Sequence, residues 1–87
     1  MITKTLCLST EHISPTTYND LRDDIVDSVY VKGYDNWGIT VCSEYDDIDV
    51  PEDIKRVLDY AQKLGCRFVN FDADEDIIDE LPVYDWE

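Results

Sequence analysis

One histidine lies close in the sequence to side chains that could serve as nucleophiles. His12 follows Cys7 and Ser9 near the start of the chain. A histidine activates such a group only when the two side chains are within hydrogen-bonding distance in the fold, which sequence spacing does not establish. A lone histidine beside a helix start is more often a structural hydrogen-bonding residue. We therefore expect no enzymatic activity and keep a small enzyme that uses His12 as an alternative.

An acidic run late in the chain resembles the opening of a calcium-binding loop. Asp72, Asp74 and Asp76 alternate as the first ligands of such a loop do. The pattern then fails, because Ile77 stands where the loop needs glycine and Val83 where it needs a bidentate glutamate. With only three glycines the chain also lacks a glycine-rich phosphate loop. We expect no specific metal site and no cofactor.

The charge of the chain is strongly negative. Among 87 residues, 21 Asp and Glu face seven Lys and Arg, which gives a formal net charge of −14. Solubility calls for a net charge of only about 2 to 8 in magnitude, and a larger excess destabilises a compact state by self-repulsion. The same charge repels nucleic acid and anionic lipid, so we expect neither to bind directly. It favours a basic protein as the partner.

The acidic residues fall into clusters that we expect to form the binding surface. Carboxylates three and four residues apart on a helix lie about 5–6 Å from one another, an interval similar to the charge spacing along a nucleic-acid strand. Two tyrosines near these clusters would add apolar anchors, because aromatic side chains carry much of the energy of protein interfaces. The alternative is an ordinary solvated face, with some acids merely favouring a helix N-terminus. The predicted partner-binding residues are Asp20, Asp23, Asp24, Asp27, Tyr34, Glu44, Tyr45, Asp46, Asp47 and Asp49.

Hydrophobic periodicity and turn residues predict the elements that position these groups. Ser14-Pro15 is a typical helix start, and a stripe of Ile54, Val57, Leu58 and Ala61 predicts a second helix that Gly65 ends. The predicted strands cover residues 3–9, 29–32, 37–43 and 66–71, the predicted helices cover residues 15–27 and 51–64, and a turn covers residues 33–36. An acidic loop is expected at residues 44–49, and apolar residues on both faces of 66–71 predict a central strand.

This order of elements predicts the fold class. A β-α-β-β-α-β chain suits a single α+β domain over residues 1–87, a split sandwich with a four-stranded sheet and two helices on one face. A sheet with a different strand order is the alternative. Three cysteines without a signal-peptide pattern predict reduced thiols and a cytoplasmic protein.

Several short motifs resemble one known family. They are Ser9-Thr10-Glu11-His12, Val50-Pro51-Glu52-Asp53, Leu64-Gly65-Cys66 and the ending Leu81-Pro82-Val83-Tyr84-Asp85-Trp86. Together they resemble the small acidic family of unknown function numbered 5983, which is carried on phages, plasmids and other mobile elements. Glu11 departs from the pattern, since members often have a small residue there. The resemblance implies a mobile-element origin and, by analogy of setting and charge, an anti-CRISPR or anti-restriction role.

Charge and resemblance together predict an inhibitory binding protein. Its acidic surface would occupy the basic nucleic-acid-binding site of a host defence enzyme, as a DNA mimic does. The main alternative is an antitoxin, immunity or regulatory module that binds another basic protein. The two hypotheses differ in whether nucleic acid competes for the partner.

Overall fold

The computed structural model describes residues 4–23, 26, 28–34 and 38–84 of the chain. Its elements follow the predicted order of strands and helices, with one short 3-10 turn at Thr10–His12 between the first strand and the first helix. The elements are β1 (Thr5–Leu8), α1 (Pro15–Arg22), β2 (Val29–Tyr34), β3 (Gly38–Tyr45), α2 (Glu52–Lys63) and β4 (Phe68–Asp72). The predicted α+β class is confirmed.

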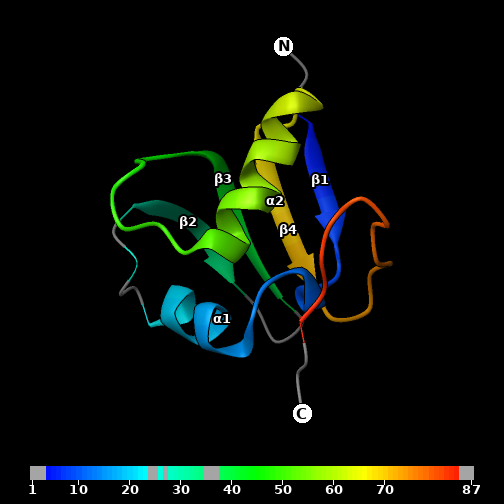
Figure 1. Cartoon of the computed structure of the whole chain (residues 1–87), viewed down its shortest axis with the longest axis horizontal. Coiled ribbons are helices and arrows are strands. Elements are labelled where there is room, and N and C mark those ends of the chain that lie inside the picture. The colour runs from blue at the N-terminus through cyan, green and yellow to red at the C-terminus, as the bar shows by residue number, and fades with distance from the viewer. Residues whose placement is uncertain (1–3, 24–25, 27, 35–37, 85–87) are drawn as a thin grey trace.

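The four strands form one mixed sheet in the order β1-β4-β3-β2 (Figure 1). β4 pairs in parallel with β1 and antiparallel with β3, and β3 pairs antiparallel with β2. β4 is therefore central, as its apolar sequence predicted. The strand order, which the sequence left open, places β1 at one edge and β2 at the other.

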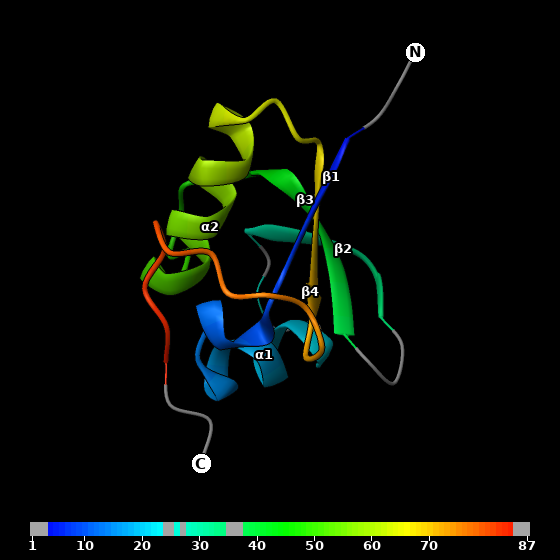
Figure 2. The ribbon, with the colours of Figure 1, turned by 90° about the vertical axis from the view of Figure 1, so that its right-hand side faces the viewer.

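The core lies between α2 and the sheet. The stripe of Ile54, Val57, Leu58 and Ala61 is buried, as predicted. It joins a cluster that includes Val69 and Phe71 of the central strand. α2 covers one face of the sheet, and α1 lies at the end of the sheet on the same side (Figure 2). The opposite face carries no helix among the described residues.

Local capping explains where the helices begin and end. The Ser14 hydroxyl accepts the amide N–H of Thr17 at 3.2 Å and caps α1, as predicted. α2 follows Pro51, and Gly65, with φ of 78°, ends it in the left-handed conformation that glycine tolerates. Asp53 in the first turn of α2 is buried, and its Oδ2 accepts the Ser14 amide at 2.8 Å. This carboxylate therefore joins the starts of the two helices.

Several predicted bounds were wrong. α1 stops at Arg22 rather than at residue 27, because acidic side chains are unfavourable beside the carbonyl end of a helix. β3 continues through Tyr45, because Tyr45 pairs with Val29 and prolongs the ladder beyond the predicted strand end. Gly33 belongs to β2 rather than to the predicted turn, of which residues 35 and 36 lie outside the described residues.

Candidate functional site

The first predicted acidic cluster consists of four aspartates that the sequence placed on one helix, namely Asp20, Asp23, Asp24 and Asp27. Because α1 ends at Arg22, fewer of them lie on the helix than predicted. Asp20 is half-buried on the helix, and Asp23 is exposed and forms its C-cap. Asp24 and Asp27 lie outside the described residues. The structure therefore describes one carboxylate on the helix and one at its end, rather than the line of four that the sequence predicted.

The second predicted cluster is divided between β3 and the loop that follows it. Glu44 is exposed near the end of β3, while Tyr45, the last residue of β3, is half-buried against the core. The Tyr45 hydroxyl donates to Oδ1 of Asp59 at 2.6 Å. This hydrogen bond to a carboxylate, together with desolvation, raises the pKa of Tyr45 to about 12. Tyr34 ends β2, and its side chain lies outside the described part of the structure.

The β3–α2 loop, residues 46–51, is held on two sides by hydrogen bonds and an ion pair. The amide of Asp46 donates to the carbonyl of Ser28 at 2.8 Å, and its Oδ2 accepts the Tyr30 hydroxyl at 2.6 Å. This acceptor also raises the pKa of the Tyr30 phenol. On the other side Asp47 pairs with the ammonium of Lys55 at 3.2 Å. These contacts give the loop a defined shape.

The tip of the β3–α2 loop exposes an aliphatic side chain between carboxylates. Ile48 is 72% exposed, and its amide donates to the carbonyl of Asp46 at 2.8 Å in a tight turn. Asp49 follows with φ of 54°, a left-handed conformation that aspartate adopts more readily than most residues. The turn thus presents an apolar group with an exposed carboxylate on each side.

A third acidic surface lies on the segment that follows β4, here called the C-terminal strap (residues 73–84). Its exposed residues include Asp74, Glu75, Asp76, Asp79 and Glu80. Ile77, in the middle of this series, is 48% exposed, whereas Leu81 is buried and fixes the strap to the core. An exposed aliphatic residue among carboxylates therefore occurs on both the loop and the strap.

His12 holds the C-terminal strap through hydrogen bonds to the strap's backbone. The side chain is fully buried, its Nε2 accepts the amide N–H of Ile78 at 2.8 Å, and its Nδ1 lies 2.9 Å from the carbonyl oxygen of Pro82. Since Nε2 is an acceptor, the neutral ring carries its proton on Nδ1 and donates it to Pro82. Both nitrogens of His12 are thus engaged by backbone groups. The sequence predicted a structural hydrogen-bonding role for His12 but not its partners, because these lie far away along the chain.

Two backbone hydrogen bonds extend this attachment. The amide of Ser9 donates to the carbonyl of Asp76 at 3.2 Å, and the amide of Tyr84 donates to the carbonyl of Glu11 at 2.8 Å. The strap therefore follows the 3-10 turn after β1 over most of its length. The strap is held by its own backbone atoms and by the buried Leu81, so its acidic side chains take no part in the attachment and stay exposed.

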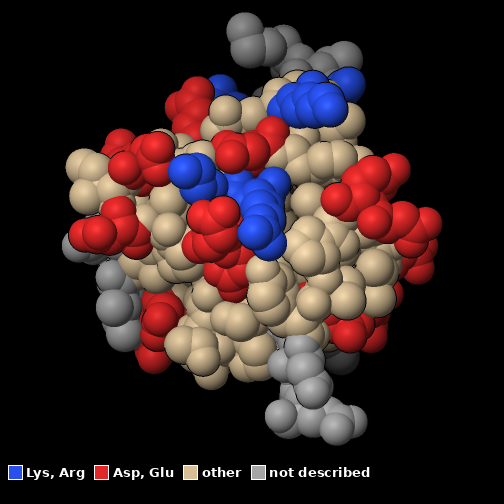
Figure 3. All heavy atoms as spheres, in the orientation of Figure 1, with Lys and Arg blue, Asp and Glu red and all other residues tan. Residues whose placement is uncertain are grey.

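Most of the carboxylates in the described part of the chain form no ion pair with another described residue. Between described residues the structure has two ion pairs, Lys55 with Asp47 and Arg56 with Glu52 at 3.8 Å. On the face shown in Figure 3, acidic side chains gather on the left, over the β3–α2 loop, and on the right, over the strap, while over α2 between them Lys and Arg lie beside further acidic side chains. The loop and the strap are thus two acidic patches separated by a surface of mixed charge over α2.

Among the described residues there is neither a cluster of metal ligands nor a helix that could span a membrane. No group of three or more His, Cys, Asp or Glu side chains in the described ranges is arranged to hold a metal ion. In the segment that resembles a calcium loop, Oδ1 of Asp72 accepts the amide of Asp74 at 2.9 Å. None of the helices that the structure describes is both long and apolar enough to cross a membrane.

Comparison with known families assigns the chain to one of them. The model of a family of unknown function, the DUF5983 C-terminal domain, matches residues 5–86. The chain therefore belongs to this family, as the motifs predicted, and the domain is an acidic α+β member of it. No curated protein and no solved structure matches the chain.

Proposed function

We propose that this domain is a binding protein whose two acidic patches, the β3–α2 loop and the C-terminal strap, dock onto a basic surface of another protein. The observation that carries the proposal is the exposed aliphatic residue within each patch. Ile48 is 72% exposed beside Asp47 and Asp49, and Ile77 is 48% exposed beside Asp76. An apolar centre within a charged rim is the usual anatomy of a protein interface.

The negative charge of the two patches would orient a basic partner and accelerate its association with the domain. Carboxylates without cations create a strong negative potential, which steers a basic partner and raises the association rate. The aliphatic side chains add the area that is removed from water on contact, and this apolar burial stabilises the complex. Because backbone hydrogen bonds and Asp47–Lys55 hold both patches, binding requires little ordering of the chain.

The partner we propose is a nucleic-acid-binding component of a host defence system. Such proteins carry Lys and Arg in grooves that fit a polyanion, and an acidic domain that occupies the groove excludes DNA or RNA. This function fits a gene on a mobile element, the origin that the resemblance implied. The three free cysteines suit a reducing cytoplasm as the place of the encounter.

Affinity capture with matched variants tests this function. The wild-type domain is immobilised, host lysate is passed over it, and retained proteins are identified after elution with salt or with duplex DNA. One variant changes the strap (Ile77→Ser, Asp74→Asn, Glu75→Gln), and a second changes the loop (Ile48→Ser, Asp49→Asn). Leu64→Ser is the control, because Leu64 is a similarly exposed aliphatic residue, at 44%, at the far end of α2.

We expect wild type and Leu64→Ser to retain the same basic protein, and at least one patch variant to lose it. Elution by modest salt and by DNA would support docking in a nucleic-acid groove. Elution by salt but not by DNA would favour an antitoxin, immunity or regulatory partner instead. Retention that ignores salt and survives both patch variants would refute an acidic interface.

A further inference from the structure

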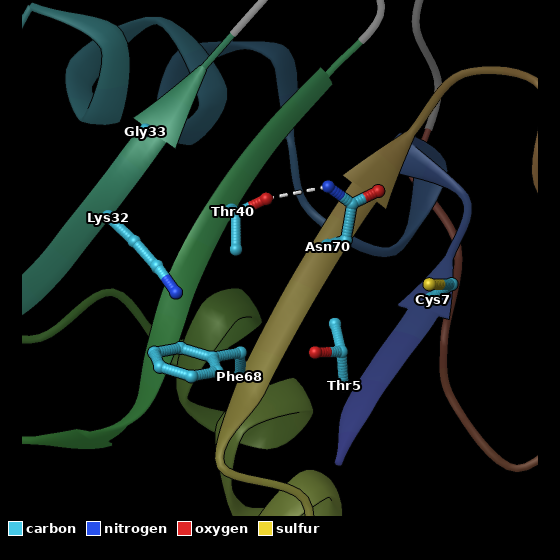
Figure 4. A pocket seen from close by; sticks show the side chains of 7 residues that line it. All are labelled: Thr5, Cys7, Lys32, Gly33, Thr40, Phe68 and Asn70. Atoms are coloured by element: carbon cyan, nitrogen blue, oxygen red, sulfur yellow. Dashed lines mark hydrogen bonds between the residues drawn. The ribbon is translucent and has the colours of Figure 1, made fainter. Parts of the chain in front are cut away.

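The face of the sheet opposite α2 carries a hollow. Side chains on β1, β3 and β4 alternate, so every second residue of each strand points away from the core. The hollow has a volume of about 540 Å³ (Figure 4). This is within the range of about 300–1,000 Å³ that is usual for small-molecule sites. It is lined by Thr5, Cys7, Lys32, Gly33, Thr40, Phe68 and Asn70.

The floor of this pocket offers a pattern of hydrogen-bonding groups. The Asn70 amide nitrogen donates to the Thr40 hydroxyl oxygen at 2.6 Å (Figure 4). This bond uses one amide hydrogen, so Asn70 keeps its carbonyl oxygen and a second N–H, and Thr40 keeps its own hydroxyl hydrogen. An acceptor and two donors on neighbouring strands match the edge of a heterocyclic ring, which carries donors and acceptors in one plane.

One end of the pocket is positively charged and aromatic. The Lys32 ammonium lies 4.1 Å from the centre of the Phe68 ring, and the Arg67 guanidinium lies 5.8 Å from the same centre. Lys32 extends across the pocket from β2 toward Phe68 on β4 (Figure 4). Two of the seven Lys and Arg residues of a very acidic chain therefore meet at one aromatic side chain. An anionic group would find its most favourable place there.

The other end of the pocket has the opposite character. Cys7 lies on β1, across the pocket from Lys32 (Figure 4). Partial desolvation and the nearby charges of Glu75 and Asp72 raise the pKa of the Cys7 thiol, so this end disfavours negative charge. The pocket is thus polarised along its length. A ligand with a single anionic end and a neutral remainder fits this gradient.

We propose that this pocket binds a mononucleotide, with the base over the Asn70–Thr40 floor and the phosphate at Lys32. The Phe68 ring lies against the Lys32 ammonium and so helps to hold this cation at the phosphate end of the pocket. None of the residues that line the pocket belongs to the loop or strap patches, so this proposal does not depend on the proposed function.

The negative charge of the domain favours a mononucleotide over a polynucleotide or a second copy of the domain. A polynucleotide would bring one phosphate per nucleotide against a domain of net charge −14, and only the Lys32 end offsets that repulsion. A second copy of the domain would bring the same negative charge to the face. A ligand with one phosphate avoids both penalties.

Titration of the ¹⁵N-labelled domain with adenosine 5′-monophosphate tests the proposal. Concentrations up to about 10 mM detect a site with a Kd of about 1 mM. We expect amide shifts at Thr5, Thr40, Phe68 and Asn70, and smaller ones with adenosine or inorganic phosphate alone. Absence of shifts at these positions would overturn the proposal. So would phosphate alone binding as tightly, or a short single-stranded oligonucleotide binding more tightly.

Two substitutions separate binding from folding. Lys32→Gln removes the cation and is expected to raise the Kd about tenfold or more, whereas Lys32→Arg retains most of the affinity. A Cβ at Gly33 meets nothing within 4 Å and Gly33 has no positive φ, so the backbone there accepts a side chain, and Gly33→Leu is designed to obstruct the pocket. We expect Gly33→Leu to fold and to lose nucleotide binding. Lys63→Gln on α2 is the control, and equal losses in Lys63→Gln and Lys32→Gln would show a non-specific charge effect and overturn the proposal.

Discussion

His12 is the side chain whose replacement tests the attachment of the C-terminal strap most directly. His12→Phe keeps an aromatic ring of similar size in a fully buried site but removes the bonds to Ile78 and Pro82. Each buried backbone group left without its partner costs about 1–3 kcal/mol. Pro82 is exposed, so its carbonyl can turn toward water, and we expect a total near the lower end, about 2–4 kcal/mol.

This loss is large for a domain of this size. An 87-residue domain has a free energy of unfolding of about 4–13 kcal/mol at 0.05–0.15 kcal/mol per residue. With a urea slope of about 1–3 kcal/mol/M, the unfolding midpoint should fall by about 1 M or more. Circular dichroism in urea measures the midpoint, and hydrogen exchange at the Ile78 amide measures the strap itself. We expect faster exchange there even without urea.

Glu11→Gln provides the control for His12→Phe. The Glu11 side chain is exposed, and only its backbone carbonyl holds Tyr84, so the substitution should leave both measurements unchanged. If His12→Phe leaves the midpoint at the wild-type value and Ile78 equally protected, the hydrogen bonds do not hold the strap, and our account of His12 is wrong.

Three further predictions concern other parts of the fold. Gly38→Ala should destabilise the domain by about 1–3 kcal/mol in urea, because the new Cβ would overlap the carbonyl of Phe71, while Gly33→Ala should cost far less. Asp59→Asn should lower the pKa of Tyr45 from about 12 toward the ordinary value of about 10, seen by ultraviolet titration. The raised pKa means that the folded state favours the neutral Tyr45 phenol. The hydrogen bond to Asp59 therefore stabilises the fold below about pH 10, and this contribution disappears toward pH 12. If the titration of Tyr45 is the same in Asp59→Asn, this hydrogen bond is not the cause of the raised pKa. The urea midpoint should rise between about 0.01 and 0.1 M salt as the Debye length shortens from about 30 to 10 Å, and a fall would mean that attractive pairs dominate.

The sequence predicted α2 more accurately than α1. Its stripe of apolar residues and the glycine after it are local signals, and both Leu58 and Gly65 behave as the sequence indicated. The first helix was predicted too long, because apolar spacing continues past Arg22 while the helix dipole opposes the acids that follow. Local patterns are reliable where no second effect competes with them.

The candidate sites depend on contacts that no local pattern contains. Ile78 meets His12 across most of the chain, and Lys32 reaches Phe68 only because the sheet brings β2 near β4. The acidic composition predicted the kind of surface but not which carboxylates are used internally. Asp53, for example, lies in the first turn of α2, and its side chain accepts the Ser14 amide and so joins the two helices.

The pairing of β1 with β4 has a consequence for how the chain folds during synthesis. Thr5 finds its partner Phe68 only after both helices and the hairpin between them have been made. Pairs so distant in sequence form late, because a long loop must close before the contact forms. Until then the amide and carbonyl groups of β1 have no ladder partner, and its apolar side chains are exposed to other chains in the cell. A nascent domain of this topology is therefore most prone to aggregation before β4 emerges, and a ribosome that stalls after α2 would leave a chain that has no complete sheet.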